Sequence, residues 1–167
     1  MNQSQEEQFL TYYEELSDAI FRHCYFRLYN REEARDLTQE AFIKTWQYLA
    51  GGKEVENLKA FIYRVANNLV IDYVRKKKSL SLDELHEAGF DPKGDDQIKA
   101  QHAAEIRELA QHLEKLPDDY REAVTLRYFN DLMPREIAEI TGESENVVSV
   151  RITRGVQKLR EHLHHER

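Results

Sequence analysis

The sequence predicts an all-α protein of two small helical domains joined by a flexible acidic linker, with a helix-turn-helix in the second domain. Over long stretches, apolar residues recur every three or four positions, the spacing that buries one stripe of a helix. Only 6 glycines and 3 prolines interrupt the 167 residues. The helical spacing stops after Lys78 and resumes near Ala103, which divides the chain into residues 1–78, 79–100 and 101–167.

Three amphipathic helices are expected in the first domain. Asn30 and Asn57 suit the N-caps of the second and third helices, and the pair Gly51-Gly52 breaks the chain between them. Cys24 and Trp46 lie on apolar stripes, so we assign both to the core. The three stripes consist of Phe9, Tyr12, Tyr13, Leu16, Ile20 and Cys24; of Ala34, Leu37, Ala41, Phe42, Thr45, Trp46 and Leu49; and of Leu58, Phe61, Ile62, Val65, Leu69 and Tyr73.

The second domain is expected to contain four helices. Before it, residues 79–97 combine glycine, proline and several acids, which is typical of an exposed linker. Pro117 ends the first helix of the domain and opens the next, at residues 118–129. Two further helices are expected at 134–140 and 145–163. The stripe of the first helix consists of Ala103, Ile106, Leu109, Ala110, Leu113 and Leu116.

The charge distribution favours localised contacts with nucleic acid. The net charge is −7, yet residues 59–78 carry six Lys/Arg and one Asp, and residues 145–160 carry four Lys/Arg and one Glu. Between these basic segments, residues 79–105 carry two Lys and seven acids. Two basic segments in an acidic protein indicate two separate nucleic-acid contacts, with acidic surfaces left for other partners.

Several other classes of function are disfavoured. No segment has the roughly 20 apolar residues of a membrane span, and the polar N-terminus does not resemble a signal peptide. A single cysteine allows no internal disulfide, which fits a reducing, cytoplasmic setting. We find no phosphate-binding loop, nucleophile elbow or metal-ligand cluster, so no enzyme activity, cofactor or metal is expected. His162, His164 and His165 could hold a metal weakly, or form a solvated tail.

Residues 134–156 have the pattern of a helix-turn-helix. Ala138 is small enough for a second helix to cross closely, Gly142 suits the left-handed end of the first helix, and Ser144 suits the next N-cap. Gly155 inside the second helix is expected to cost about 1 kcal/mol relative to Ala. The alternative is an ordinary helical hairpin with a solvated face. The residues that could face the major groove are Ser149, Arg151, Thr153, Arg154 and Lys158.

The third helix could bind melted DNA. Aromatic rings stack on unpaired bases, cations hold the backbone, and asparagine can hydrogen-bond a flipped base. The alternative is that Phe61 and Tyr73 belong to the core and that the lysines stabilise the C-terminus of the helix. The helix ends in a basic run at 75–78, and its middle is expected to display Phe61, Tyr63, Arg64, Asn67 and Asn68.

Taken together, these segments resemble the sigma-70 family of transcription initiation factors, specifically its small extracytoplasmic-function (ECF) group. Residues 36–46 (DLTQEAFIKTW) resemble family region 2.1–2.2, and residues 60–76 (AFIYRVANNLVIDYVRK) resemble regions 2.3–2.4. Residues 116–129 (LPDDYREAVTLRYF), followed by the helix-turn-helix, resemble region 4. The segments occur in the family's order and cover most of both predicted domains.

The resemblance implies three binding surfaces. The spacing of residues alone would leave the polar side of the second helix exposed to solvent. The resemblance implies instead that this side docks on the clamp helices of the polymerase β′ subunit through Asp36, Gln39, Glu40 and Lys44. The loop 51–57 and the start of the next helix would hold a flipped base of the −10 promoter element. The −10 set consists of Phe61, Arg64, Asn67, Asn68, Arg75, Lys76 and Lys77. The set that reads the duplex −35 element consists of Arg127, Ser149, Val150, Arg151, Thr153, Arg154 and Lys158.

The implied function is promoter recognition and DNA opening at a specific set of stress or envelope-type promoters. The implied partners are core RNA polymerase, contacted at the β′ clamp helices and β flap, promoter DNA in duplex and melted form, and an anti-sigma factor that holds the chain inactive. No small-molecule substrate and no membrane insertion are expected. A rival hypothesis is a repressor or activator that uses the C-terminal domain alone, which leaves the helices of the first domain without a role.

Overall fold

The computed structural model describes residues 1–79 and 97–165, and all regular structure in these ranges is helical. The predicted all-α class is confirmed. The elements are α1 (Gln3–Leu28), α2 (Arg31–Ala50), α3 (Leu58–Ser79), α4 (Gln97–Glu114), α5 (Asp118–Val124), the π-helical segment η1 (Thr125–Phe129), α6 (Pro134–Thr141) and α7 (Glu145–His165). None of these helices combines the length and the apolar character needed to cross a membrane.

The helix boundaries follow local capping signals. The Asn30 side chain accepts a hydrogen bond from the Glu33 N–H at 3.1 Å, as predicted for an N-cap. The Asn57 side chain accepts one from the Ala60 N–H at 3.0 Å. Helix α4 begins at Gln97, four residues before the expected start of the second domain. The rest of the expected flexible linker, at 80–96, lies outside the described residues.

The first three helices bury their predicted stripes against one another. Ile20 and Cys24 are fully buried in α1, which packs against both α2 and α3. Burial raises the pKa of the Cys24 thiol to about 12, so the thiol stays protonated in the core. Tyr13 departs from its expected place on the stripe, because it is 49% exposed, although its ring contacts Phe42 at 4.9 Å and Phe9 at 6.5 Å between centroids.

The C-terminal helices form a second packed group. The predicted helix at 118–129 exists, but its last five residues widen into the π-helical segment η1. Helix α7 crosses α5 at Gly155, where an added Cβ would lie 2.6 Å from Val124 Cγ2. The glycine that looked costly from helix propensity therefore permits this close crossing. Ile106, placed on the α4 stripe, remains 38% exposed.

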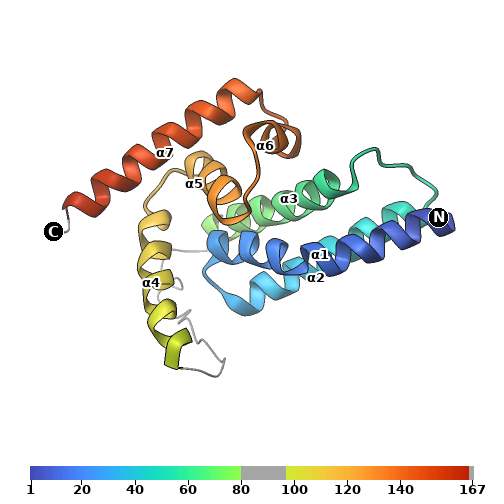
Figure 1. The fold of residues 1–167 in the computed structure, drawn as a ribbon, viewed down its shortest axis with the longest axis horizontal. Coiled ribbons are helices and arrows are strands. Elements are labelled where there is room, and N and C mark those ends of the chain that lie inside the picture. The colour runs from blue at the N-terminus through green and yellow to red at the C-terminus, as the bar shows by residue number, and fades with distance from the viewer. Residues whose placement is uncertain (80–96, 166–167) are drawn as a thin grey trace.

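The two groups of helices pack against each other (Figure 1), chiefly where α6 lies on α3 and where η1 lies on α1. The Phe26 and Phe129 rings meet at 4.2 Å between centroids. The Asn130 side-chain amide donates to the Ala19 carbonyl at 2.7 Å, and the Tyr29 hydroxyl donates to the Ala110 carbonyl. Because these contacts join α1 to η1 and α4, one buried apolar cluster runs through both groups.

Candidate nucleic-acid interface

Helices α6 and α7 form the predicted helix-turn-helix. Gly142 ends α6 in the left-handed conformation, with φ of 76°. The Ser144 hydroxyl then accepts a hydrogen bond from the Val147 N–H at 3.1 Å, as an N-cap does. Val148 and Ile152 are buried and fix α7 against the rest of the group. The opposite side of α7 is left at the surface.

We call that opposite side the recognition face; it consists of Ser149, Val150, Arg151, Thr153, Arg154 and Lys158. Thr153, Arg154 and Lys158 are exposed, which fits a surface for DNA. Arg151 is held close to the protein, because its guanidinium lies 3.2 Å from Glu143 and 3.6 Å from Asp119.

Arg127 is positioned by residues close to it in the chain. In η1, its guanidinium lies 3.7 Å from the Asp131 carboxylate and 5.5 Å from the centroid of the Tyr128 ring. It is half-buried, whereas Tyr128 is 58% exposed. The structure thus leaves Arg127 accessible beside the helix-turn-helix but already paired.

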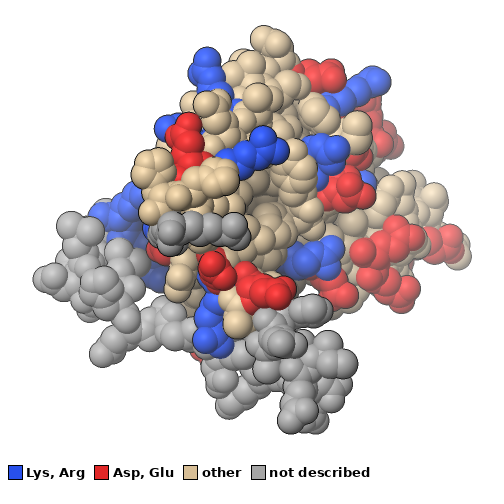
Figure 2. Space-filling model, turned by 60° about the vertical axis from the view of Figure 1, so that its left-hand side comes forward, with Lys and Arg blue, Asp and Glu red and all other residues tan. Residues whose placement is uncertain are grey.

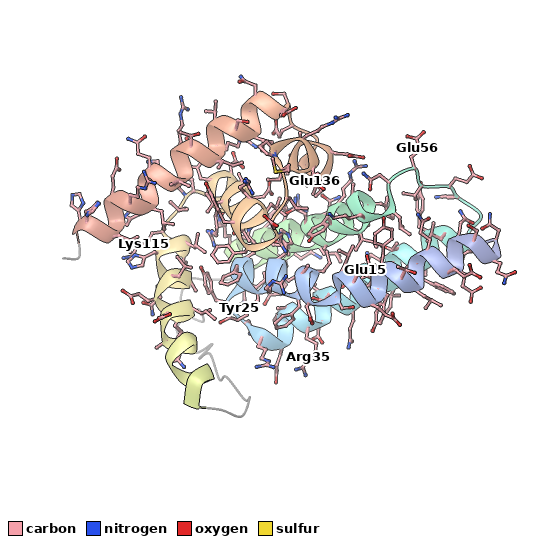
Figure 3. The ribbon with its side chains drawn as sticks, in the orientation of Figure 1. Glu15, Tyr25, Arg35, Glu56, Lys115 and Glu136 are labelled. Carbon is pink, nitrogen blue, oxygen red and sulfur yellow. The ribbon has the colours of Figure 1, made fainter. Side chains whose placement is uncertain are left out.

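A hollow of about 320 Å³ lies at the N-terminal end of α3, and we call it the base pocket. The Tyr48 and Phe61 rings meet there at 4.7 Å between centroids, and the Lys53 ammonium lies 4.6 Å above the Tyr48 ring. Its volume is at the small end of the range for ligand pockets, about 300–1,000 Å³. The loop before α3 forms one wall and carries Glu56 (Figure 3). The lining consists of Tyr48, Glu54, Val55, Glu56, Asn57, Ala60, Phe61, Arg64 and Glu139.

The middle of α3 only partly matches the expected display of side chains. Arg64 and Asn68 are exposed, and Phe61 is half-buried at the base pocket. The expectation that Tyr63 and Asn67 are displayed is wrong, since they are 1% and 2% exposed. Both face the packed helices, where Asn67 accepts from Arg27 at 3.3 Å and donates to Glu122 at 3.2 Å.

The basic side chains at the C-terminal end of α3 differ in their exposure and in their contacts. Arg75 is exposed and lies 2.9 Å from Asp72 of the same helix. The Lys77 ammonium lies 5.1 Å from the Tyr73 ring centroid, a cation–π contact. Lys76 is exposed. Lys78 instead donates to the Asp118 carboxylate of α5 at 2.7 Å, and this hydrogen bond is the main reason that the pKa of Asp118 is lowered.

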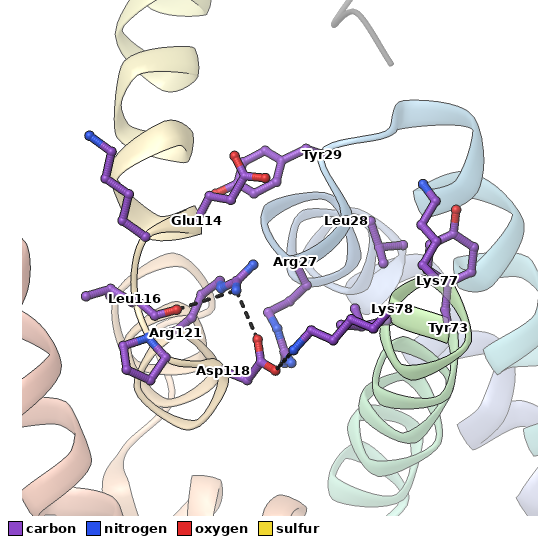
Figure 4. A pocket seen from close by; sticks show the side chains of 13 residues that line it. Arg27, Leu28, Tyr29, Tyr73, Lys77, Lys78, Glu114, Leu116, Asp118 and Arg121 are labelled. Atoms are coloured by element: carbon purple, nitrogen blue, oxygen red, sulfur yellow. Dashed lines mark hydrogen bonds and ion pairs between the residues drawn. The ribbon is translucent and has the colours of Figure 1, made fainter. Parts of the chain in front are cut away.

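A larger hollow, of about 550 Å³, separates the ends of α1 and α3 from α4 and α5 (Figure 4). At its floor, Asp118 accepts hydrogen bonds from Lys78 and from Arg121, the latter at 3.0 Å. Arg121 also donates to the Leu116 carbonyl at 3.5 Å. The Lys78–Asp118 contact joins α3 to α5 across the hollow, whereas the buried Arg121 Nε atom has no hydrogen-bond partner among the described residues.

Basic side chains are dispersed over one face of the molecule. On the face drawn in Figure 2, Lys and Arg are scattered among Asp and Glu and form no continuous basic patch. Among the described residues, no group of three or more His, Cys, Asp and Glu is arranged to hold a metal ion.

The predicted polar side of α2 lies at the surface. Asp36, Gln39 and Lys44 are exposed, and Glu40 pairs with Lys44 at 3.4 Å. Ile43 lies among them and is 56% exposed, although it was not in the expected set of docking residues. Its position four residues after Gln39 could have revealed it. We call these five residues the α2 polar face.

Comparisons with known families match both groups of helices. Residues 12–80 match the family described as Sigma-70 region 2, and residues 106–159 match Sigma-70, region 4. The ECF RNA polymerase sigma factor SigW of Bacillus subtilis (strain 168) is 34% identical over 156 residues, which cover 87% of this chain and 83% of that protein. SigM, an ECF sigma factor from the same organism, is 32% identical over 151 residues, covering 89% and 90%.

Solved structures share the fold over nearly the whole chain. The sigma factor RpoE in complex with the anti-sigma factor NepR, from Bartonella quintana, has a TM-score of 0.73 at 20% identity, covering 96% of this chain and 99% of that chain. CnrH in complex with the cytosolic domain of CnrY has a TM-score of 0.74 at 20% identity, covering 97% and 91%. At this level of identity, the likeness concerns the fold.

Proposed function

This chain belongs to the ECF group of the sigma-70 family of transcription initiation factors, and we propose that it brings core RNA polymerase to promoters through two separate DNA contacts. Residues 1–78 are proposed to act as the region 2 domain and residues 101–167 as the region 4 domain, joined by residues 79–100. The observation that carries the proposal is that one chain combines the base pocket, which Arg64 helps to line, and a helix-turn-helix with an exposed recognition face.

The base pocket is proposed to receive one base of the melted −10 element. Tyr48 and Phe61 supply aromatic surface for stacking, and Asn68 lies exposed on the same helix as Phe61 to hydrogen-bond a base edge. Arg64, Arg75, Lys76 and Lys77 would hold the nearby phosphates. Asn67 is assigned no base contact while the two groups of helices are packed together, because its amide is occupied by Arg27 and Glu122.

The recognition face of α7 is proposed to read the duplex −35 element in the major groove. Ser149 and Thr153 can hydrogen-bond base edges or phosphates, and Arg154 can make a bidentate contact with guanine. Val150, which is 37% exposed, can contact a thymine methyl group. Lys158 and Arg127 would contact the flanking backbone.

The α2 polar face is proposed to dock on the β′ clamp helices of core polymerase. Ile43 supplies an apolar centre, and Asp36, Gln39, Glu40 and Lys44 form a polar rim, an arrangement typical of protein interfaces. A contact of the region 4 domain with the β flap completes the polymerase interface in this proposal. No catalytic step is assigned to the chain.

An anti-sigma factor is proposed to hold the chain inactive in the cytoplasm until a stress or envelope signal releases it. RpoE and CnrH, which share this fold over most of their length, were each solved with such a partner or its cytosolic domain. The target promoters would then be those of a stress or envelope response.

The direct test is to mix the chain with core polymerase and a promoter library and to sequence the transcripts. We expect core binding and transcripts that start downstream of a shared pair of −10 and −35 sequences. A chain that binds duplex DNA but not core polymerase would instead be a repressor or activator.

The same assay tests the docking face through Ile43→Ser. We expect core affinity to fall about tenfold or more, because burying an isoleucine is worth about 1.5–3 kcal/mol. Leu10→Ser is the control, since Leu10 is also an exposed aliphatic residue, at 51%, but lies on α1, outside the proposed polymerase contacts. An equal loss of affinity for core polymerase in both variants would contradict the proposal that the α2 polar face docks on the polymerase.

A further inference from the structure

The hollow of about 550 Å³ between the ends of α1 and α3 and the helices α4 and α5 has a positively charged lining. We call it the basic hollow. Among the described residues, its basic lining residues are Arg27, Lys77, Lys78, Lys115 and Arg121, and its acidic ones are Glu114 and Asp118. This excess of positive charge, which comes from both groups of helices, favours an anion inside the hollow.

Asp118 is shared by two cations at the floor of the basic hollow (Figure 4). The Lys78 ammonium lies 2.7 Å from its carboxylate, and the Arg121 guanidinium lies 3.0 Å from it. Arg27 has its own counter-charge in Glu122, at 3.6 Å, which does not line the hollow. One carboxylate therefore compensates two cations, so a net positive charge remains at the floor.

Arg121 has hydrogen-bonding capacity that the described part of the protein does not use. Its side chain is 12% exposed, and its guanidinium donates to Asp118 and, at 3.5 Å, to the Leu116 carbonyl. The Nε atom is buried and has no hydrogen-bond partner among the described residues. A buried N–H without an acceptor is unfavourable. A phosphate oxygen in the hollow would supply the acceptor after a small rotation of the side chain, since a guanidinium matches the geometry of phosphate.

Aromatic side chains form part of the wall of the basic hollow. Tyr29 follows α1 in the left-handed conformation, with φ of 55°, which is uncommon for a residue with a bulky side chain. Its hydroxyl donates to the Ala110 carbonyl of α4, which fixes the ring at the hollow. Tyr73 of α3 lines another side, and the Lys77 ammonium lies 5.1 Å from its ring centroid (Figure 4). The two rings offer surface to a flat aromatic group.

We propose that the basic hollow binds a small phosphorylated molecule with an aromatic ring, of the nucleoside diphosphate class. Its phosphates would lie among Lys77, Lys78 and Arg121. Its ring would pack against Tyr29 or Tyr73. The volume of about 550 Å³ is within the range of ligand pockets, about 300–1,000 Å³. This ligand takes no part in promoter recognition, so the inference goes beyond the function proposed above and does not depend on it.

Such a ligand would link the two groups of helices, because α1 and α3 form one side of the basic hollow and α4 and α5 form the other. A ligand that binds the packed arrangement and not the unfolded chain raises the stability of the protein as its concentration rises. Affinity and thermal stability are therefore two readouts of the same site.

The first experiment titrates ADP and GDP separately into the full chain by isothermal titration calorimetry at one fixed salt concentration. Pyrophosphate and adenosine are titrated as the two halves of the ligand. We expect at least one nucleotide to bind once per chain, about tenfold or more tightly than either half, because the phosphate and ring contacts act together. Pyrophosphate that bound as tightly as both nucleotides would overturn the nucleotide class. No binding of ADP or GDP would overturn the inference altogether.

Two arginine variants locate the site. Arg121→Gln removes a cation from the basic hollow, whereas the matched control Arg64→Gln removes one from the base pocket, which could also take a nucleotide. We expect Arg121→Gln to weaken nucleotide binding about tenfold or more, as for the loss of a charge-assisted hydrogen bond, and Arg64→Gln to change it less than about twofold. A loss confined to Arg64→Gln would place the nucleotide in the base pocket, and equal losses would indicate a general charge effect. Either result would overturn the inference.

Lys77→Gln tests the same site from the other group of helices. Circular dichroism shows whether each variant is folded, and Lys77→Gln decides the outcome if Arg121→Gln is not. The nucleotide should raise the midpoint of thermal unfolding of the unmodified chain and of Arg64→Gln, and that of Lys77→Gln by less. An equal rise in Lys77→Gln and in the unmodified chain would contradict the site. Neither measurement involves polymerase or promoter DNA, so its failure would leave the proposed function untouched.

Discussion

The Arg27 guanidinium lies 3.6 Å from the Glu122 carboxylate, with the two side chains only 3% and 12% exposed. Burial lowers the pKa of Arg27, and the Glu122 charge opposes this effect. Each ion has lost most of its contact with water, so each depends on the other for compensation. The pair joins α1 to α5 and therefore couples the two groups of helices.

Replacing one residue of the Arg27–Glu122 pair should lower the free energy of unfolding more than replacing both residues. We expect Glu122→Leu to lower the free energy of unfolding by up to about 3–5 kcal/mol, because it leaves Arg27 buried without its counter-charge. The double variant Arg27→Met/Glu122→Leu should recover much of that loss. Urea denaturation of Glu122→Leu, Arg27→Met and the double variant measures the difference in the free energy of unfolding. A double variant no more stable than Glu122→Leu would show that the pair is not coupled.

Gly155→Ala should destabilise the protein although alanine favours helix. The new Cβ would lie 2.6 Å from Val124 Cγ2 and 3.3 Å from Tyr120 Cβ. Overpacking of this kind costs about 1–3 kcal/mol, which exceeds a propensity gain of about 1 kcal/mol. Thermal unfolding of the unmodified chain and of Gly155→Ala shows whether the substitution raises or lowers stability.

The matched background for this test is Val124→Ala, which removes the nearest methyl group. There, Gly155→Ala should become neutral or stabilising, because the propensity gain remains and most of the crowding is gone. The same loss in both backgrounds would mean that the α5–α7 crossing is not what requires glycine.

Stability should fall as the pH drops below 6.5, because His23 is buried. Burial, helped by the Arg27 charge, lowers the pKa of His23 from 6.5 to about 3. Between these values the unfolded chain binds a proton that the folded chain refuses, so His23 contributes a slope of about 1.4 kcal/mol per pH unit. The contribution is complete above pH 6.5 and is lost as the pH falls toward 3.

His23→Gln isolates this effect, since glutamine does not titrate. Urea denaturation at several pH values between about 6.5 and 5 should give a smaller slope for the variant than for the unmodified chain, because in this window most carboxylates remain charged in both states. Equal slopes would show that His23 is not the group responsible.

Arg154→Ala should weaken binding to duplex −35 DNA about 5- to 150-fold, the equivalent of losing a contact worth about 1–3 kcal/mol. Arg160→Ala is the control, because it removes the same charge from an exposed position of the same helix outside the recognition face. Electrophoretic mobility shift at constant salt measures both. A loss in the control as large as that in Arg154→Ala would indicate a general charge effect rather than base reading.

Features set by neighbouring residues could be predicted from the sequence. The caps at Asn30 and Ser144 and the left-handed Gly142 depend on contacts within a few positions. Most residues of the predicted apolar stripes are also buried, because burial of one helix face follows directly from apolar spacing.

The packing of the two groups of helices could not be predicted in this way. Asn67 is polar and lies in the middle of a helix, so pattern favours exposure. It is buried because Arg27 and Glu122, both distant in sequence, satisfy its side chain. Tyr63 is buried for a related reason, since α3 is covered by α1 on one side and by α6 on another. The spacing of apolar residues shows which face of a helix is apolar. It does not show whether another helix, distant in sequence, will cover a polar face.

The two proposed promoter contacts are tested most directly by a crossed measurement of transcription. Asn68→Ala and Arg154→Ala would each be assayed with core polymerase on two libraries, one randomised in the −10 element and one in the −35 element. Because Asn68 belongs to α3 and Arg154 to α7, we expect Asn68→Ala to change preference only in the −10 library and Arg154→Ala only in the −35 library. If either variant changed both libraries alike, or if neither changed its own, the division of promoter reading between α3 and α7 would be wrong.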